Sequence, residues 1–284
     1  MHAIKTEGLA KKYGKFEALR GVDLTVPEGS VFGLVGPNGA GKTTLIKALV
    51  GTLRPTSGAV RVLGLDPLKN RAELRESIGY MPQSPALYDD LPARENVRFF
   101  GAAHRVPDLG KKVGEVMEFA ELSGRAKDPV HTFSGGMKRR VSLACALVHE
   151  PRMLFLDEPT AAVDPQLRSR FWKQFRELAR NSGVTLFIST HLMDEAMLCD
   201  RVAILRRGEI IASETPKHIL ENGGVRLAMK RNGENIERRI GGRPEDLADA
   251  LHGYGLARDI GAVSVEADTL EDVVLAIIGE EEKR

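Results

Sequence analysis

Short apolar runs alternate along the chain with longer segments in which apolar residues recur every three or four positions. The runs are rich in Val, Ile, Leu and Phe and lie at residues 30–35, 152–157, 184–189 and 201–205. The segments with helical periodicity include residues 42–51, 168–181 and 194–198. Near-continuous apolar strands that alternate with helices are typical of a parallel sheet covered on both faces. The pattern therefore predicts an α/β fold.

The two ends of the chain differ in pattern from its middle. The first thirty residues hold short alternating segments, which predict a small antiparallel sheet. Residues 85–150 are mostly helical by periodicity, and residues 221–224 (ENGG) are typical of a linker. We predict a main domain at residues 1–221 and a small α+β accessory domain at residues 222–284. In the accessory domain we expect a helix, a strand and a second helix at residues 243–255, 262–267 and 269–279.

Composition narrows the class of protein. A hydrophobic content of 42% is enough for a sizeable core, and a net charge of +2 argues against bulk electrostatic binding to nucleic acid. We find no secretory signal pattern and no apolar run near the ~20 residues that span a bilayer. We therefore expect a cytoplasmic chain that meets a membrane only through a partner. Cys145 and Cys199 lie in apolar segments, which is typical of buried thiols in a reducing compartment.

A glycine-rich loop, GPNGAGKTT, directly follows the first apolar run and matches G-x-x-x-x-G-K-[ST]. Glycines let the backbone turn tightly, so that several N–H groups converge on phosphate oxygens at the start of a helix. Lys42 can reach the β- and γ-phosphates, and the Thr43 hydroxyl can bind Mg²⁺. The strand before and the helix after favour a nucleotide loop over a glycine turn with an incidental lysine. The loop residues are Gly36, Pro37, Asn38, Gly39, Ala40, Gly41, Lys42, Thr43 and Thr44.

Polar side chains follow three other apolar runs. Asp157 and Glu158 end the run MLFLDE, at the strand tip where α/β sheets place their ligands. There Asp157 would hold Mg²⁺, and Glu158 would orient or deprotonate the attacking water. His191 follows residues 184–189, where a γ-phosphate contact is favoured over a structural hydrogen bond. Gln83 follows the strand-like SIGYMP and can reach Mg²⁺ or water, although a lone glutamine is a weak signal.

The segment HTFSGGMKRR at residues 131–140 admits three interpretations: a flexible basic loop, a nucleic-acid patch, or the start of a helix that holds an anion. Residues 141–148 form a helical run, so Ser134 suits the N-cap. Gly135 and Gly136 leave the backbone free at the helix start. Because a helix N-terminus attracts anions, the third interpretation is favoured.

The motifs GPNGAGKTT, MPQ, SGG, LFLDEPT, AAVDP and STH occur in this order, which resembles the ATP-binding cassette (ABC) family of transport ATPases over about residues 3–220. The resemblance implies a RecA-like P-loop NTPase core with a helical signature subdomain, and ATP and Mg²⁺ as cofactors. SGGMKRR, LDEPTAAVDPQLR and the tail TLEDVVLAIIG are similar to the daunorubicin-resistance branch. The ATPase subunits of that branch work with ABC-2-type membrane permeases, mostly in export.

The resemblance also assigns roles to individual residues. An aromatic residue near the N-terminus stacks on adenine in such cassettes, which implies Tyr13. Gln83 matches the Q-loop residue, Asp164 in AAVDP the D-loop aspartate, and His191 the switch histidine. Glu158 matches the catalytic glutamate.

The signature motif of the family is usually LSGGQ, whereas this chain has FSGGM, with Phe133 in place of Leu and Met137 in place of Gln. Ser134, Gly135 and Gly136 are kept. The resemblance implies a head-to-tail pair in which each ATP lies between the P-loop of one subunit and the SGG segment of the other. The three basic residues after Met137 are then expected to contact solvent or a partner rather than nucleic acid.

The expected function is that of the ATP-hydrolysing subunit of an ABC transporter, which drives substrate movement, in particular export, through a separate permease at the inner face of the cell membrane. The expected partners are a second copy of the same or a homologous subunit and the permease, with no nucleic acid. The alternative is a soluble ABC ATPase that acts on nucleic acid or the ribosome. Such proteins commonly carry two cassettes or a long coiled-coil insertion, and this chain shows neither. A regulatory module without turnover is disfavoured by the intact Lys42, Asp157, Glu158 and His191.

Overall fold

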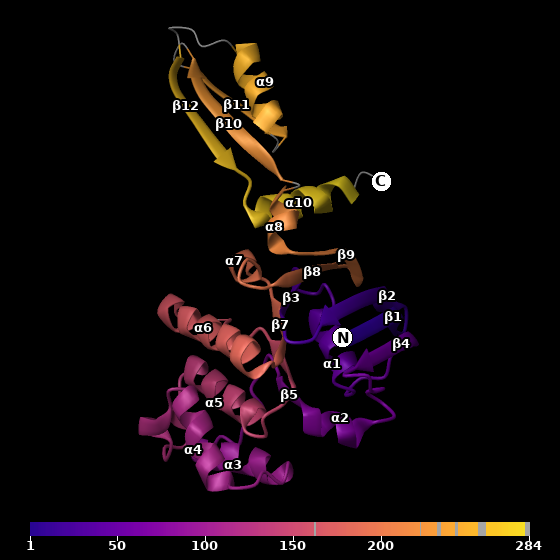
Figure 1. Cartoon of the computed structure of the whole chain (residues 1–284), viewed down its shortest axis with the longest axis vertical. Coiled ribbons are helices and arrows are strands. Elements are labelled where there is room, and N and C mark those ends of the chain that lie inside the picture. Colours follow the sequence, from indigo (N-terminus) through magenta and orange to yellow (C-terminus); the bar gives the residue numbers. More distant parts are fainter. Residues whose placement is uncertain (162, 222, 232–233, 242–243, 255–259, 282–284) are drawn as a thin grey trace. The chain divides into compact units, whose positions relative to one another are not determined.

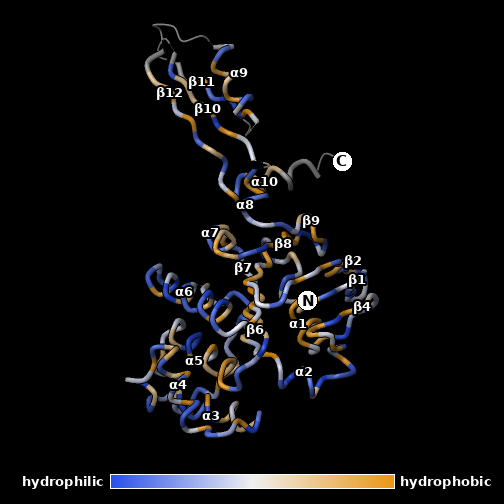
Figure 2. The backbone as a smooth tube through the Cα atoms, in the orientation of Figure 1, coloured by the Kyte–Doolittle hydropathy of each residue, from blue (hydrophilic) through white to orange (hydrophobic). Residues whose placement is uncertain are grey.

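The computed structural model describes residues 1–161, 163–221, 223–231, 234–241, 244–254 and 260–281. The chain forms two compact units. The larger consists of Met1–Leu192 and Leu198–Ser213, and the smaller of Met193–Met197 and Glu214–Arg284. Figure 1 labels most of their elements, and Figure 2 labels β6.

A six-stranded sheet forms the centre of the larger unit. Its strand order is β5-β6-β7-β3-β8-β9, and the pairs from β5 to β8 are parallel. The strands are β3 (Val31–Val35), β5 (Ile78–Met81), β6 (Met153–Asp157), β7 (Thr185–Thr190), β8 (Arg201–Arg206) and β9 (Glu209–Glu214). Every residue of β3, β6 and β7 is buried, as expected of parallel strands with both faces covered. The predicted parallel sheet is confirmed.

A three-stranded antiparallel sheet, also predicted, lies in the same unit. Its order is β2-β1-β4, with β1 (His2–Tyr13), β2 (Phe16–Pro27) and β4 (Ser57–Val62). Helix α1 (Lys42–Leu49) contacts strands of both sheets, β2, β4 and β6. Figure 2 colours much of α1 toward the hydrophobic end of the scale, and Leu45, Ile46 and Leu49 are fully buried. This packing fixes the start of α1 at the carboxyl edge of the central sheet.

Among the remaining helices of the larger unit, those within residues 85–150 and the helix near 168–181 were predicted, whereas α2 was not. They are α2 (Arg71–Ser77), α3 (Ala93–Ala103), α4 (Leu109–Phe119), α5 (Gly135–Leu147) and α6 (Pro165–Ser182), with 3₁₀ turns at Ser123–Arg125 and Val130–Thr132. Helices α3, α4 and α5 pack on one another and form the helical subdomain. Helix α6 begins at Pro165 rather than at residue 168. The reason is local: the Asp164 carboxylate accepts a hydrogen bond from the Leu167 N–H, and proline suits the first helical position.

The smaller unit has the predicted α+β character. Its antiparallel sheet has the order β11-β10-β12, with β10 (Gly224–Arg231), β11 (Glu234–Gly241) and β12 (Ile260–Ala267). Its helices are α7 (Met193–Ala196), α8 (Pro216–Glu221), α9 (Pro244–Tyr254) and α10 (Leu270–Glu281). Helix α9 packs against β11, and α10 packs against α7 and α8. Gly255, the predicted end of α9, and Asn222 of the predicted linker lie outside the described residues.

Cys145 and Cys199 are buried and are not in disulfide bonds, and burial raises the pKa of the Cys145 thiol. Both agree with the prediction of buried thiols.

Over the residues that the structure describes, we find no helix with the length and apolarity needed to cross a bilayer.

Candidate active site

The predicted phosphate loop connects β3 to α1, and two of its glycines have no room for a side chain. A Cβ atom on Gly36 would lie 2.2 Å from the Leu205 carbonyl oxygen, and one on Gly41 would lie 2.6 Å from the Ala18 carbonyl oxygen. Gly41 also has φ of 111°, where other residues are strained, and it is the N-cap of α1. The loop therefore turns tightly and presents backbone N–H groups at a helix start, the arrangement that binds phosphate.

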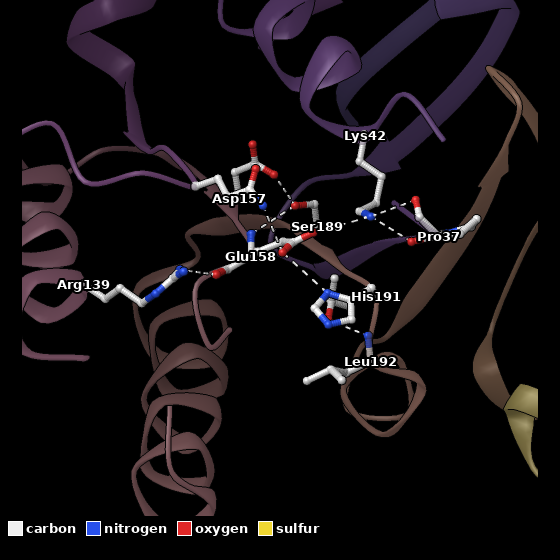
Figure 3. Close-up of polar contacts among 11 residues, drawn as sticks. Pro37, Lys42, Arg139, Asp157, Glu158, Ser189, His191 and Leu192 are labelled. Atoms are coloured by element: carbon white, nitrogen blue, oxygen red, sulfur yellow. Dashed lines mark hydrogen bonds and ion pairs between the residues drawn. The ribbon is translucent and has the colours of Figure 1, made fainter. Parts of the chain in front are cut away.

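Lys42 is held inside this loop. Its Nζ donates to the carbonyl oxygens of Gly36 at 2.7 Å and Pro37 at 3.2 Å, and it lies 3.5 Å from Oε1 of Glu158 (Figure 3). The ammonium group is buried, and a buried charge must be paired or hydrogen-bonded. These contacts keep Lys42 in the loop, as its predicted role requires.

Asp157 ends β6 and is fully buried. Its Oδ1 accepts a hydrogen bond from the Ser189 hydroxyl, whereas Oδ2 has no hydrogen-bond partner among the described residues. A buried carboxylate oxygen without a partner is costly. Burial raises the pKa of Tyr80 to about 12, and the negative charge of Asp157 adds to that rise. Mg²⁺ prefers oxygen ligands such as carboxylates and hydroxyls. The Oδ2 atom of Asp157, which has no hydrogen-bond partner among the described residues, therefore fits a divalent cation.

The backbone of Glu158 has the left-handed conformation, with φ of 51°. For a residue with a Cβ atom this costs roughly 1–2 kcal/mol, so the surroundings must hold it. Its N–H donates to the Ser189 carbonyl oxygen at 3.1 Å and to the Ser189 hydroxyl at 3.0 Å. On the other side, Nη1 of Arg139 donates to the Glu158 carbonyl oxygen (Figure 3). Glu158 is therefore fixed from β7 and from α5.

The Glu158 carboxylate is the point where the other predicted catalytic side chains meet. Nε2 of Gln83 donates to Oε2 at 3.2 Å, and Nδ1 of His191 lies 3.5 Å from the same oxygen. Lys42 approaches the other oxygen. Gln83 follows β5, Glu158 follows β6 and His191 follows β7. Because these strands are adjacent and parallel, the three residues lie at the same carboxyl edge of the sheet.

For Tyr13, Asp164 and the SGG segment, the described residues show local contacts but no contact to this cluster. Tyr13, at the end of β1, is 49% exposed, and Lys11 lies over its ring at 4.9 Å. Asp164 caps α6. Ser134 caps α5 through the Met137 N–H, as predicted, and a Cβ atom on either following glycine would meet nothing within 4 Å.

Sequence reasoning missed two residues of the cluster, Ser189 and Arg139. Ser189 is a polar residue that follows the apolar centre of β7 near the end of the strand, which was an available signal. Arg139 was expected to contact solvent or a partner, yet it reaches the backbone of Glu158. Burial lowers the pKa of Arg139, while the negative charges of Glu158 and Asp157 oppose that fall. Its neighbours also make contacts within the chain, Lys138 with Asp89 and Arg140 with Glu121.

Similarity to known proteins identifies the family of this chain. The family model described as "ABC transporter" matches residues 19–161. The probable multidrug ABC transporter ATP-binding protein YbhF of Escherichia coli (strain K12) is 42% identical over 215 residues, which cover 75% of this chain and 37% of YbhF. This chain thus spans little more than a third of YbhF. The daunorubicin resistance ATP-binding protein DrrA3 of Streptomyces coeruleorubidus is 34% identical, with 99% of this chain and 97% of DrrA3 covered.

A solved structure supports the same assignment. The dimeric, post-hydrolysis structure of the ATP-binding cassette MJ0796 with ADP and Pi superimposes with a TM-score of 0.67 and 28% identity. The match covers 75% of this chain and 98% of that one. The phosphate loop and the strand-end carboxylates are consistent with what these relatives show. The chain is an ATP-binding cassette and belongs to the ABC transporter family.

Proposed function

We propose that this chain is the ATP-hydrolysing subunit of an ABC exporter. The observation that carries the proposal is the Glu158 carboxylate, held within 3.5 Å of Lys42 and His191 and hydrogen-bonded to Gln83. A buried carboxylate beside a phosphate loop is placed to orient or deprotonate a water molecule. Multidrug and daunorubicin-resistance names among the relatives support the export branch.

In the proposed reaction the loop residues 36–44 bind the phosphates of ATP through their backbone N–H groups. Lys42 exchanges the carbonyl oxygens of Gly36 and Pro37 for phosphate oxygens and offsets charge on the γ-phosphoryl group. Glu158 orients the attacking water. His191 and Gln83, which contact Glu158, sense the γ-phosphate, and Tyr13 stacks on the adenine ring.

Mg²⁺ is the metal that we propose for the site. Asp157, with its unpartnered Oδ2, would hold it together with Thr43 on the first turn of α1 and with Gln83. When bound, the ion supplies positive charge against the developing negative charge of the γ-phosphoryl group.

Replacing Asp157 with asparagine should raise the Mg²⁺ concentration for half-maximal ATP hydrolysis at least tenfold, about 1.4 kcal/mol. Asparagine keeps a carbonyl acceptor for the Ser189 hydroxyl but loses the charge that attracts the cation. A Mg²⁺ titration at fixed ATP concentration measures the effect. Asp108→Asn is the matched control, because Asp108 is exposed and has a φ of 50° that asparagine tolerates. An unchanged midpoint in Asp157→Asn would remove Asp157 from the metal site.

We further propose that two cassettes, either identical or homologous, work as a head-to-tail pair. Ser134, Gly135 and Gly136 of one subunit would contact the ATP bound to the P-loop of the other, with Asp164 at the junction. The open space around the two glycines supports this, because no packing within the described chain explains their lack of side chains. Closure would then require the γ-phosphate, which ADP lacks.

We assign these ATP-handling steps to residues 1–221, with the helical part at about 85–150, and treat residues 222–284 as an accessory domain. The substrate would move through a separate permease of the ABC-2 type, which would hold the cassette at the inner face of the cell membrane. Relatives named as transporter or drug-resistance ATP-binding proteins favour this over a cassette that acts on nucleic acid or the ribosome.

Detergent purification of the tagged full-length chain from its own host tests the permease assignment. Mass spectrometry is expected to find an integral membrane protein enriched over an untagged control. Recovery of ribosomal proteins or nucleic acid, with no membrane protein enriched, would favour the soluble-cassette alternative.

A further inference from the structure

We propose that Arg139 is a positioning residue that holds the catalytic Glu158 in place and ties it to the helix that begins at the SGG segment. This inference rests on the proposed function, since it concerns the same carboxylate. Nη1 of Arg139 donates a hydrogen bond to the Glu158 carbonyl oxygen (Figure 3). The contact joins α5 to the residue after β6.

The contact is specific to Arg139 among three consecutive basic residues. Lys138 pairs with Asp89 at 2.7 Å, and Arg140 approaches the Glu121 carboxylate at 3.6 Å. Successive residues on a helix point about 100° apart, so Arg139 alone of the three faces the strand-end cluster. Its half-buried guanidinium is more weakly hydrated than an ammonium group, which suits a donor beside buried carboxylates.

Glu158 has a particular need for such a donor. Its left-handed backbone is not a conformation that glutamate adopts readily, so hydrogen bonds must hold it. Ser189 holds the N–H side of the residue, and on the carbonyl side the donors are Arg139 and the Ala161 N–H at 3.3 Å. Without Arg139 the carbonyl side keeps only the longer contact. The peptide can then rotate, and the carboxylate moves away from the water that it must orient.

Arg139 also links the carboxylate to the predicted contact with the partner cassette. Helix α5 starts at its N-cap Ser134, five residues before Arg139, which is about 7.5 Å along a helix axis. A helix moves as a rigid body over that distance. If contact with a second subunit moved the SGG segment, α5 would move with it. The Arg139 side chain would then transmit that movement to the Glu158 backbone.

Steady-state kinetics of the full-length chain test the proposal. Arg139→Ala is expected to lower kcat for ATP hydrolysis by about tenfold to a hundredfold, the scale of a small misplacement of a catalytic group. KM for ATP and the affinity for a fluorescent ATP analogue are expected to stay within about twofold, because the polar contact of Arg139 among the described residues is with Glu158 and not with the phosphate loop. Arg139→Lys, which can still donate to a carbonyl oxygen, should recover most of kcat. Arg140→Ala is the matched control and should keep kcat within about twofold.

A double variant separates positioning from an independent effect. If Arg139 acts through Glu158, then Arg139→Ala added to Glu158→Gln lowers the residual rate by less than about twofold. A full tenfold or larger further loss in the double variant would overturn the proposal. So would wild-type kcat in Arg139→Ala, or an equal loss of kcat in Arg139→Lys. If the wild-type chain itself hydrolysed no ATP, that result would refute the proposed function and not the role of Arg139.

Discussion

Glu158→Gln is expected to reduce ATP turnover by about 10²- to 10⁴-fold while ATP binding is retained. This is the range that a positioned general base contributes. Glutamine has nearly the same shape and can still accept the hydrogen bond from Gln83, so the site should keep its form. It cannot take a proton from water. The change also removes a negative charge 3.5 Å from Lys42, which should favour phosphate binding by that lysine.

Phosphate release and the affinity for a fluorescent ATP analogue, measured on the same preparation, check this expectation. Glu150→Gln is the matched control, because it makes the same chemical change at an exposed carboxylate that pairs with Lys112. The control should keep wild-type turnover. Near-normal turnover in Glu158→Gln would end the assignment of this residue as the base.

Ser134→Arg is expected to lower ATP turnover of the complete assembly by about a hundredfold. Ser134 is exposed at the start of α5, and the glycines that follow leave open space. An arginine there fills the space that the proposal reserves for the ATP of the other subunit. Loss of the cap by itself costs only about 1 kcal/mol of stability, so unfolding does not account for the expected effect.

Thr132→Arg distinguishes a block at the SGG segment from a general effect of an added arginine. Thr132 is also exposed and lies two residues before Ser134, outside the phosphate-contacting motif. The assembly with Thr132→Arg should hydrolyse ATP at close to the wild-type rate. Unchanged steady-state hydrolysis with Ser134→Arg would show that the SGG segment has no role across the interface.

Much of the site could be predicted because its parts are local in sequence. The phosphate loop needs a strand, a glycine turn and a helix in succession, and all three lie within residues 30–51. Ser134 followed by two glycines and a helical run predicted the cap of α5. Asp157 and Glu158 lie at the end of one apolar run, and His191 lies two residues after another. The rule that ligands bind at the carboxyl ends of parallel strands therefore predicted that they would lie together.

What could not be predicted depends on contacts between distant segments. Ser189 bonds Asp157 and Glu158 because β7 lies beside β6, and strand order is not encoded in either strand alone. Arg139 reaches Glu158 because packing of α3, α4 and α5 sets the rotation of α5. The left-handed backbone of Glu158 likewise has no local signal, since glutamate does not favour it. These are the contacts that fix the carboxylate.

The mass in solution of the full-length Glu158→Gln variant, measured by light scattering, tests most directly whether two cassettes enclose ATP. With ATP and Mg²⁺ the mass should be twice that of the monomer, whereas with ADP and Mg²⁺ it should be that of the monomer. Adding Ser134→Arg should return the ATP sample to the monomer mass. A monomer in saturating ATP, in a variant shown to bind the nucleotide, would contradict a site shared between two cassettes.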